Sequence, residues 1–371
     1  MKAFEIRDGF GIERLTLVDK PEPIPGPGQV LVKLRALSLN YRDLMVVTGT
    51  YNPRMKLPRI PFSDGAGEVV AIGPGVTRVK VGDRVTPIFM QKWIEGEPDV
   101  EKGKSALGGA IDGLLAEYVA LDQEGLVHIP EHLSYEEAAT LPCAAVTAWH
   151  ALIVEGKIKP GDVVLTQGTG GVSIFATQFA HMAGARVIVT SSSDQKIERA
   201  RKLGATEGIN YKESPDWDKK AMELTAGVGA DHVVELGGAG TINKSLRAVR
   251  LGGQISVIGA LAGGAGDVST VSILMKNVRV QGIFVGSRKM FEDMNRAISL
   301  HKMQPFVDRV FRFDETRDAL RHLEHAQGID VVENLLDLLG YCHCLHSYRR
   351  VLGARCWVLG WGTSLPPTPN T

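Results

Sequence analysis

The sequence predicts an α/β protein with two domains, in which a β-rich unit precedes a doubly wound parallel sheet. First, residues up to about Asp122 carry short alternating apolar and polar runs that Gly and Pro separate. Second, from Asp162 onward apolar strand candidates alternate with amphipathic helix candidates, which is typical of a parallel sheet. Third, the length of 371 residues suits two domains that each bury a core.

In the first unit, the clearest strand candidate is Gln29–Ala36, where apolar and polar residues alternate after the turn-forming cluster Pro25–Gly28. Further short strands are expected at Gly67–Ile72 and Asp83–Ile88. Residues 91–112 are polar and rich in Gly and Lys, so we expect an irregular excursion there.

The second unit opens with a helix that Ser134 and Glu137 cap reciprocally. Helices are then expected at Val172–Ala183 and Asp194–Leu203, and a last one at Glu315–His325 returns the chain to the first domain. The strand candidates between them are Val163–Thr166, Arg186–Thr190, Glu207–Ile209, His232–Leu236, Gln254–Ile258 and Arg279–Phe284.

Composition excludes several classes of protein. The 42 basic and 42 acidic side chains balance, which argues against a nucleic-acid or acidic-membrane partner. The chain contains no run of about 18 apolar residues, so no transmembrane helix is expected. Only four cysteines occur, and a single one before Cys342 cannot build a disulfide framework. We therefore expect a cytoplasmic protein that acts on a small molecule.

The strongest motif is the run Gly168, Thr169, Gly170, Gly171 and Val172, which follows a strand and opens a helix. Glycines allow backbone amides to approach a pyrophosphate closely, and the helix amino terminus adds the positive end of its dipole. A glycine triplet alone can be an ordinary turn, but the flanking strand and helix favour a dinucleotide site.

The residue at the end of the second strand suggests which dinucleotide binds. Ser191 stands where NAD-preferring enzymes carry Asp, and a serine can donate a hydrogen bond to a 2′-phosphate that a carboxylate would repel. Lys196 and Arg199 are near enough to add positive charge. NADPH is therefore favoured over NADH, although a solvated helix face would also explain the two cations.

Seven short motifs are specific in combination. They are Pro25–Val32, Asn40–Asp43, Phe62–Val69, Val81–Val85, Ala116–Val119, Leu141–Pro142 and Gly282–Arg288. With the glycine loop, they resemble the medium-chain dehydrogenase/reductase superfamily, and within it the zinc-free quinone oxidoreductase-like or NAD(P)-dependent alcohol dehydrogenase-like branch.

The resemblance implies a GroES-like β-barrel catalytic domain over residues 1–128, completed by residues of about 300–332. It implies a Rossmann NAD(P)-binding domain with a doubly wound parallel sheet over residues 129–299, and an active-site cleft between the domains. Such proteins are often homodimers joined through the edges of their Rossmann strands. Residues 333–371 do not resemble the family, and we expect them to form an atypical, poorly ordered tail.

The resemblance also bears on metal binding. Zinc-dependent relatives carry a Cys, a Gly-His-Glu run and a second Cys at positions that fall here on Asn40, Phe62–Asp64 and Cys143. Only Cys143 keeps a ligand type, whereas a catalytic zinc needs three protein ligands. Residues 90–112 contain none of the four cysteines that a structural zinc would need. We therefore predict no metal site and no zinc.

Several side chains are candidates for contact with the acceptor. By resemblance, Asn40 and Tyr51 line the substrate cleft, and Tyr41 is a further hydrogen-bond donor. Arg42 and Asp43 are more simply explained as a structural ion pair at a helix start. Asp64 could anchor its loop by accepting backbone amides, and His150 fits a satisfied, partly buried histidine.

The remaining cofactor contacts follow from the resemblance and from the positions of strand ends. Residues on the helix that enters the Rossmann domain, and residues after the third, fifth and sixth strands, should line the dinucleotide. These residues are Val146, Thr147, Tyr211, Gly259, Leu261, Phe284, Gly286 and Ser287.

The predicted function is NADPH-dependent, zinc-independent hydride transfer to a quinone, an enone or a related carbonyl, because delocalised acceptors do not need a Lewis acid. The first alternative is an NAD(P)-dependent alcohol dehydrogenase-like enzyme that acts on a larger secondary alcohol. The second is a nucleotide-binding protein with little turnover.

Overall fold

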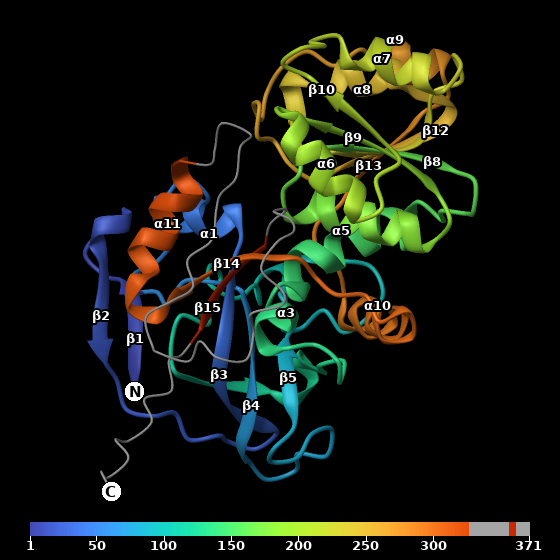
Figure 1. Cartoon of the computed structure of the whole chain (residues 1–371). Coiled ribbons are helices and arrows are strands. Elements are labelled where there is room, and N and C mark those ends of the chain that lie inside the picture. The colour runs from blue at the N-terminus through green and yellow to red at the C-terminus, as the bar shows by residue number, and fades with distance from the viewer. Residues whose placement is uncertain (326–355, 361–371) are drawn as a thin grey trace, which may run out of the picture.

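The computed structural model describes residues 1–325 and the strand Cys356–Gly360, and it forms two parts that lie one above the other in Figure 1. The upper part holds a parallel sheet between helices, and the lower part holds a mixed sheet. This arrangement of sheets confirms the predicted fold class.

The upper sheet has six strands in the order β10-β9-β8-β11-β12-β13. Every neighbouring pair is parallel, and the strand order reverses at β8, which is the doubly wound Rossmann arrangement. The strands lie within a few residues of the predicted ones. They are β8 (Val163–Gln167), β9 (Arg186–Ser191), β10 (Glu207–Asn210), β11 (Ala230–Glu235), β12 (Val249–Val257) and β13 (Arg279–Gly282).

Alternating apolar side chains fix which helices cover each face of this sheet. Val164 packs into the cluster formed with α5 and α6, whereas Leu165 packs into the cluster on the side of α7 and α8. The helices are α5 (Gly171–Met182), α6 (Asp194–Lys202), α7 (Trp217–Leu224), α8 (Ile242–Ala248) and the short α9 (Thr270–Met275) beside the edge strand.

The lower part is built around a seven-stranded sheet among the described residues, with the order β14-β15-β3-β4-β5-β7 and β6 paired with β3. A separate hairpin of β1 (Lys2–Ile6) and β2 (Leu15–Asp19) lies beside α11 (Thr316–His325). The sheet strands are β3 (Gln29–Leu39), β4 (Asp64–Ile72), β5 (Arg84–Pro87), β6 (Tyr118–Asp122), β7 (Leu126–His128), β14 (Val307–Arg312) and β15 (Cys356–Gly360).

Strand β15 corrects one expectation. The sequence predicts a poorly ordered tail over residues 333–371, yet Cys356–Gly360 pairs in parallel with β14 and antiparallel with β3. The run Cys-Trp-Val-Leu-Gly is rich in residues that favour strands, and it closes an edge that β3 would otherwise expose. The rest of the predicted tail lies outside the described residues, as do residues 326–332 of the segment expected to complete the domain.

One helical segment joins the two parts. It runs from α3 (Tyr135–Ala139) through α4 (Val146–Trp149), with π-helical turns at Leu141–Ala145 and His150–Glu155. A single hydrophobic cluster crosses it, with Phe89 and Trp93 of the lower part and Phe175 and Phe179 of the upper part. The two parts therefore share a packed core along this segment.

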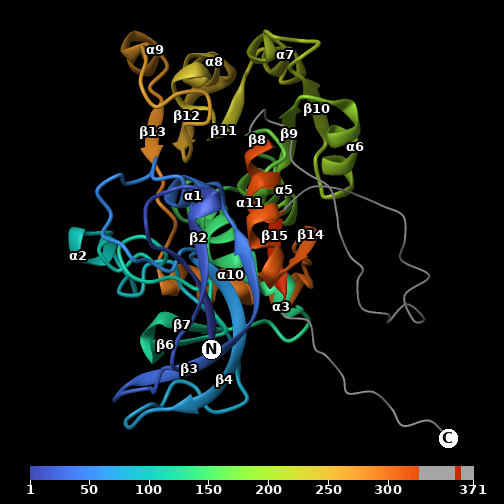
Figure 2. The same cartoon turned by 90° about the vertical axis from the view of Figure 1, so that its left-hand side faces the viewer.

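From β13 the chain descends into α10 (Arg288–His301), which packs against the lower part (Figure 2). The amides of Arg288 and Lys289 donate to the carbonyls of Trp93 and Ile94, at 2.9 and 3.0 Å. Within the described ranges no helix is long and apolar enough to cross a membrane.

Candidate functional site

The glycine loop lies between β8 and α5, at the point where the strand order reverses. Gly168 has a φ of 75°, a left-handed conformation that favours glycine, and its amide donates to Thr190 Oγ1 at 3.3 Å. A Cβ added at Gly168 or Gly170 would meet nothing within 4 Å, so the space above the loop is open. The amides of the first turn of α5 have no partner within the helix. Amides at a helix amino terminus that opens onto free space are favourable partners for an anion.

Two polar side chains at adjacent strand ends support this loop. Gln167 ends β8, Glu235 ends β11, and Gln167 Nε2 donates to Glu235 Oε2 at 2.7 Å. Glu235 is fully buried, and its Oε1 accepts from the amides of Gly237 and Gly238 at 2.8 and 2.9 Å. The sequence does not predict this pair, because buried polar residues at strand ends follow no local pattern.

The end of β9 differs from the expected phosphate contact. Ser191 is fully buried, and its hydroxyl has no hydrogen-bond partner among the described residues. Lys196 and Arg199 lie half-buried on α6, so they are not a fully solvated face. Tyr211 is close by, because its amide donates to the Ser191 carbonyl at 3.0 Å.

The predicted nicotinamide contacts come together from two segments. Val146 and Thr147 are buried on α4, and a Cβ at Gly286 would clash with the Val146 side chain, so these two segments are in contact. Val285 has a φ of 54°, an uncommon conformation for a β-branched residue. His150 Nδ1 lies 2.6 Å from the Val285 carbonyl, so this histidine is buried and satisfied, as predicted.

Three further predicted contacts lie around these segments. Phe284 is 49% exposed just before Val285, and Ser287 caps α10 by accepting from the amide of Met290 at 3.3 Å. Leu261 is exposed beyond β12, close to Gly259, and its amide donates to the Leu236 carbonyl at 3.1 Å.

Two acceptor candidates, Asn40 and Tyr41, lie at the amino end of α1 (Tyr41–Val47), and the third, Tyr51, follows the carboxyl end of this helix. Asn40 precedes this helix, and its backbone amide donates to Asp43 Oδ2 at 2.9 Å. Tyr41 and Tyr51 are 38% and 41% exposed, so both hydroxyl-bearing rings reach the surface. The Tyr51 ring lies beside the guanidinium of Arg42.

Arg42 does more than pair with Asp43, from which its Nη1 lies 3.7 Å away. Its guanidinium lies between the rings of Tyr51 and Phe89, at 5.1 and 4.8 Å from their centroids, and Nη1 donates to the Leu107 carbonyl at 2.6 Å. Phe89 in turn meets Phe284 edge-on, with ring centroids 6.1 Å apart. This stack connects Tyr51 of the lower part to Phe284 of the segment that follows β13.

The residues at the three zinc-ligand positions bond to one another instead. Ser63 Oγ donates to Asp64 Oδ1 at 2.7 Å, and the Cys143 amide donates to Asp64 Oδ2 at 2.8 Å. Asp64 therefore anchors its loop to the helical segment, as one interpretation of the sequence expects. Residues 1–325 hold no group of three or more His, Cys, Asp or Glu side chains arranged to hold a metal. An amide, a hydroxyl, an engaged carboxylate and one thiol do not fit a catalytic zinc.

Two buried carboxyl groups meet at this point. Burial raises the pKa of Asp64 to about 7, against the hydrogen bond from Ser63 and with the help of the nearby Asp43 charge. Burial also raises the pKa of Asp43 to about 6, although Arg42 opposes the shift. Burial therefore moves the pKa of both carboxyl groups toward neutral pH.

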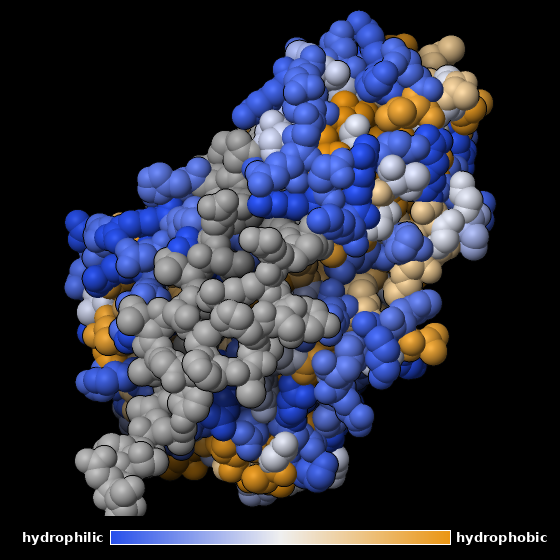
Figure 3. Space-filling model, in the orientation of Figure 1, coloured by the Kyte–Doolittle hydropathy of each residue, from blue (hydrophilic) through white to orange (hydrophobic). Residues whose placement is uncertain are grey.

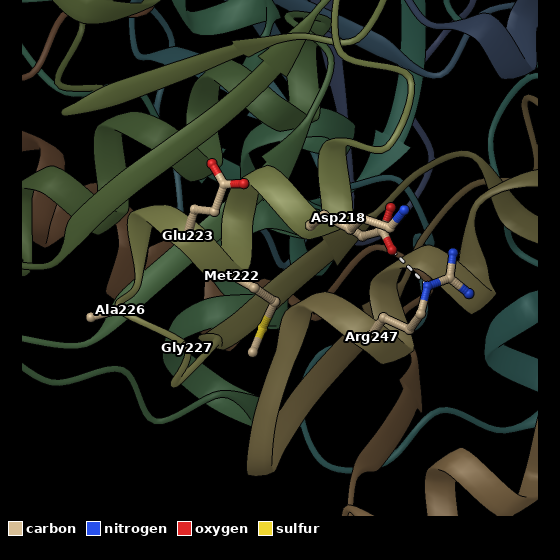
Figure 4. Close-up of a pocket in the computed structure, with 7 residues that line it drawn as sticks. Asp218, Met222, Glu223, Ala226, Gly227 and Arg247 are labelled. Carbon is tan, nitrogen blue, oxygen red and sulfur yellow. Dashed lines mark hydrogen bonds and ion pairs between the residues drawn. The ribbon is translucent and has the colours of Figure 1, made fainter.

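Two surface pockets lie away from these residues. One lies on α7 and α8, where Arg247 Nε donates to Asp218 Oδ2 at 2.6 Å, as Figure 4 shows. The other lies between β7 and the carboxyl end of α10, near His132 and Asn295. Neither is lined by a predicted site residue.

Comparisons with known proteins agree with this architecture. Residues 26–131 match the alcohol dehydrogenase GroES-like domain, and residues 171–300 match the zinc-binding dehydrogenase family. A zinc-type alcohol dehydrogenase-like protein of Schizosaccharomyces pombe is 48% identical over 80% of this chain and 87% of its own. Quinone oxidoreductase-like protein 2 of Bos taurus is 29% identical over 86% of this chain and 87% of its own.

Solved structures point the same way. An NAD-dependent alcohol dehydrogenase is 32% identical, with a TM-score of 0.83 over 98% of this chain and 100% of that one. A mycobacterial protein complexed with NADPH is 26% identical, with a TM-score of 0.75 over 97% of this chain and 99% of that one. With a GroES-like domain, a doubly wound sheet and these relatives, the chain belongs to the medium-chain dehydrogenase/reductase family and is an oxidoreductase.

Proposed function

We propose that this protein is an NADPH-dependent, zinc-independent reductase that transfers a hydride to a quinone, an enone or a related carbonyl acceptor. The observation that carries the proposal is the set of hydrogen bonds at the zinc-ligand positions, where Ser63 and the Cys143 amide occupy both oxygens of Asp64. An acceptor whose negative charge is delocalised is the class that hydrogen-bond donors alone can activate.

The chain's own groups would divide the work as follows. The amides at the start of α5 bind the diphosphate, and Val146, Gly286 and Phe284 position the nicotinamide, which supplies the hydride when bound. The exposed rings of Tyr51 and Phe284 give a flat acceptor two aromatic surfaces, and they are connected through Arg42 and Phe89.

Hydrogen bonds would then stabilise the charge that develops on the acceptor oxygen. Asn40, Tyr41 and Tyr51 are the candidate donors. Asn40 and Tyr41 lie at the start of α1, the Tyr51 ring lies beside Arg42 of the same helix, and both tyrosines reach the surface. Asp64 is engaged with Ser63 and Cys143, so its part is to hold Asn40's surroundings in place rather than to contact the acceptor.

The preference for NADPH rests on the end of β9 and the start of α6. No carboxylate stands at Ser191, and Lys196 and Arg199 lie half-buried on the adjoining helix. A doubly charged 2′-phosphate would gain from both cations. NADH remains the alternative cofactor, and the relatives include one protein named as NAD-dependent and one complexed with NADPH.

A second candidate function is NAD(P)-dependent oxidation of a larger secondary alcohol. The relative at 48% identity is named as alcohol dehydrogenase-like, which favours this chemistry. In the first candidate, the oxygen of the acceptor gains a proton when the acceptor gains the hydride. In the second, the alcohol oxygen loses a proton when its carbon loses the hydride, and this chemistry depends more on a strong Lewis acid.

We further propose a cytoplasmic homodimer joined through β13, with no nucleic-acid or membrane partner. β13 is an edge strand of the upper sheet, and Val280 on it is exposed. Beside it on α9, Val271 is 67% exposed, Leu274 76% and Met275 71%. Figure 3 shows apolar surface on the upper domain, toward α9 and β12. A second copy would pair the edge and cover this surface.

The test is a panel of acceptors and donors with the purified protein. NADPH and NADH oxidation is measured with quinones and alkenals, and NADP⁺ and NAD⁺ reduction with secondary alcohols, each with and without a chelator. We expect NADPH-linked quinone or alkenal reduction that the chelator leaves unchanged. Loss of activity on chelation contradicts zinc independence, and turnover of alcohols alone favours the second candidate. Tight NADPH binding without any turnover would instead indicate a binding protein.

A further inference from the structure

The buried network around Glu235 lies directly under the glycine loop. β8 and β11 are adjacent parallel strands (Figure 2), so Gln167 and Glu235 leave the sheet side by side. Glu235 is fully buried and accepts hydrogen bonds from Gln167 Nε2, Ser245 Oγ and Thr241 Oγ1, and from the two amides already described. A carboxylate is costly to bury unless donors surround it, and here each oxygen has at least two.

Gln167 makes the complementary set of bonds. Its Oε1 accepts from the amides of Leu236 and Gly237, both at 3.1 Å, while its carbonyl accepts from Ser173 Oγ at 2.6 Å. Ser173 lies in the first turn of α5. The side chain of Gln167 therefore holds the loop after β11, and its backbone carbonyl holds the first turn of α5, which follows the glycine loop.

The network extends to a third segment through the backbone. The amides of Leu261 and Ala262 donate to the carbonyls of Leu236 and Gly237, at 3.1 and 2.7 Å. The residues after β8, β11 and β12 are thereby set at fixed spacing along the carboxyl edge of the sheet. In a doubly wound fold this edge is where a dinucleotide lies.

We propose that Gln167 and Glu235 are positioning residues for the dinucleotide, which preset the distance between the glycine loop and the loop Leu236–Thr241 before the cofactor binds. This inference rests on the proposed NADPH-binding function. A preset site lowers the ordering cost of binding, so the network contributes to cofactor affinity without touching the cofactor.

Variants that reverse donors and acceptors in this network test the positioning role. In E235Q, the new amide nitrogen faces Gln167 Nε2, and a flip of Gln167 would turn its own nitrogen toward two backbone amides. In Q167E, two carboxylates face each other in a buried space. In the swapped variant Q167E/E235Q, the carboxylate at 167 accepts the Leu236 and Gly237 amides, and the amide at 235 donates back to it. The charge is unchanged, and Ser245 can donate to 167 and accept from 235.

The experiment compares the dissociation constant of NADPH for the wild-type protein, both single variants and the swap, with kcat at saturating NADPH and the melting temperature of each. We expect each single variant to bind NADPH about tenfold more weakly, a size typical of coupled neighbours, with kcat at saturation within about twofold. The swap should bind within about threefold of wild type.

A matched control makes the same carboxylate-to-amide change elsewhere in the domain. Asp218 is also buried and pairs with Arg247, in the pocket of Figure 4 away from the loop. D218N should lower the melting temperature and leave NADPH affinity unchanged, which separates positioning from general stability.

Three results overturn the inference. The first is a dissociation constant within twofold of wild type in both single variants, and the second is a swap that binds no better than the singles. If the single variants do not fold, the swap alone decides, and weak NADPH binding by a folded swap is the third. A wild-type protein that binds neither NADPH nor NADH instead overturns the proposed function, and this inference with it.

Discussion

The proposed cofactor side and the proposed acceptor side of this enzyme are built in different ways. The cofactor side uses backbone amides from one continuous run, Gly168–Val172, placed by a strand and a helix that follow each other in sequence. The acceptor side uses side chains from distant segments, such as Tyr51, Phe89 and Phe284, which meet only in the folded chain. Backbone sites tolerate changes of side chain that leave space free, whereas side-chain sites depend on each partner.

The largest expected effect tests the cofactor side. Gly170 has a φ of −75°, which any residue adopts, and a Cβ there meets nothing within 4 Å. G170V should therefore fold normally while its side chain fills the space for the diphosphate. We expect the dissociation constant of NADPH to rise about a hundredfold, or about 2.7 kcal/mol, measured by fluorescence titration.

Gly161 offers the control, because it lies in a turn before β8 with open space around its Cβ but has a φ of 89°. G161A should cost about 1 kcal/mol of unfolding free energy from strain and leave NADPH affinity unchanged. Normal NADPH binding by G170V would show that the diphosphate lies elsewhere.

The second prediction concerns the buried carboxyl groups of the acceptor side. Since burial raises the pKa of Asp64 to about 7, the folded state keeps a proton that the unfolded state releases near the ordinary pKa of 3.8. Stability from this group is therefore greatest at low pH and falls as pH rises between those two values. For the wild type we expect Asp64 to contribute a loss of about 2 kcal/mol of unfolding free energy between about pH 5 and pH 7.

The variant D64N should flatten this slope, because an amide does not titrate and can still accept from the Cys143 amide while donating to Ser63. Chemical denaturation of both proteins across this pH range measures the difference. D83N is the control and should leave the slope between about pH 5 and pH 7 unchanged. Lys80 and His128 help to lower the pKa of Asp83 to about 2 despite its partial burial, so this carboxyl group does not titrate in that range. Parallel pH profiles for wild type and D64N would contradict the raised pKa.

The third prediction breaks the aromatic stack. R42M removes the guanidinium between Tyr51 and Phe89 together with its hydrogen bond to the Leu107 carbonyl. We expect kcat/KM for a quinone to fall about tenfold, as a partly buried cation–π contact predicts, with NADPH affinity unchanged. R42K keeps the charge but not the planar group, so it should recover only part of the loss. An equal fall in NADPH affinity would mean that Arg42 supports the whole site rather than the acceptor.

This contrast also explains what sequence reasoning could reach. The strands of the upper sheet and the glycine loop depend on local patterns, so β9 and α6 fall within one residue of their predicted ends. Phe89, by contrast, lies just after the predicted strand Asp83–Ile88 and belongs to no motif. Its contacts with Arg42 and Phe284 follow from tertiary packing, which no local period encodes.

Buried polar groups mark the same limit. The Gln167–Glu235 pair and the buried Ser191 hydroxyl sit at strand ends, where sequence predicts position but not the direction of a side chain. Strand β15 shows a related limit, because a short apolar run separated from its partners by a long segment gives no sign of the sheet that it joins.

The smallest expected effect returns to the cofactor side and asks which dinucleotide it prefers. Because Ser191 is fully buried, a carboxylate placed there would destabilise the end of β9. Lys196 is therefore the better position to change. K196A should weaken NADPH binding about fivefold and leave NADH unchanged, since a partly exposed cation contributes about 1 kcal/mol to a phosphate contact. K202A, an exposed lysine in the last turn of the same helix, should change neither constant. Equal weakening of NADPH and NADH by K196A would place Lys196 away from the 2′-phosphate, and the proposed preference for NADPH would lose the support of this lysine.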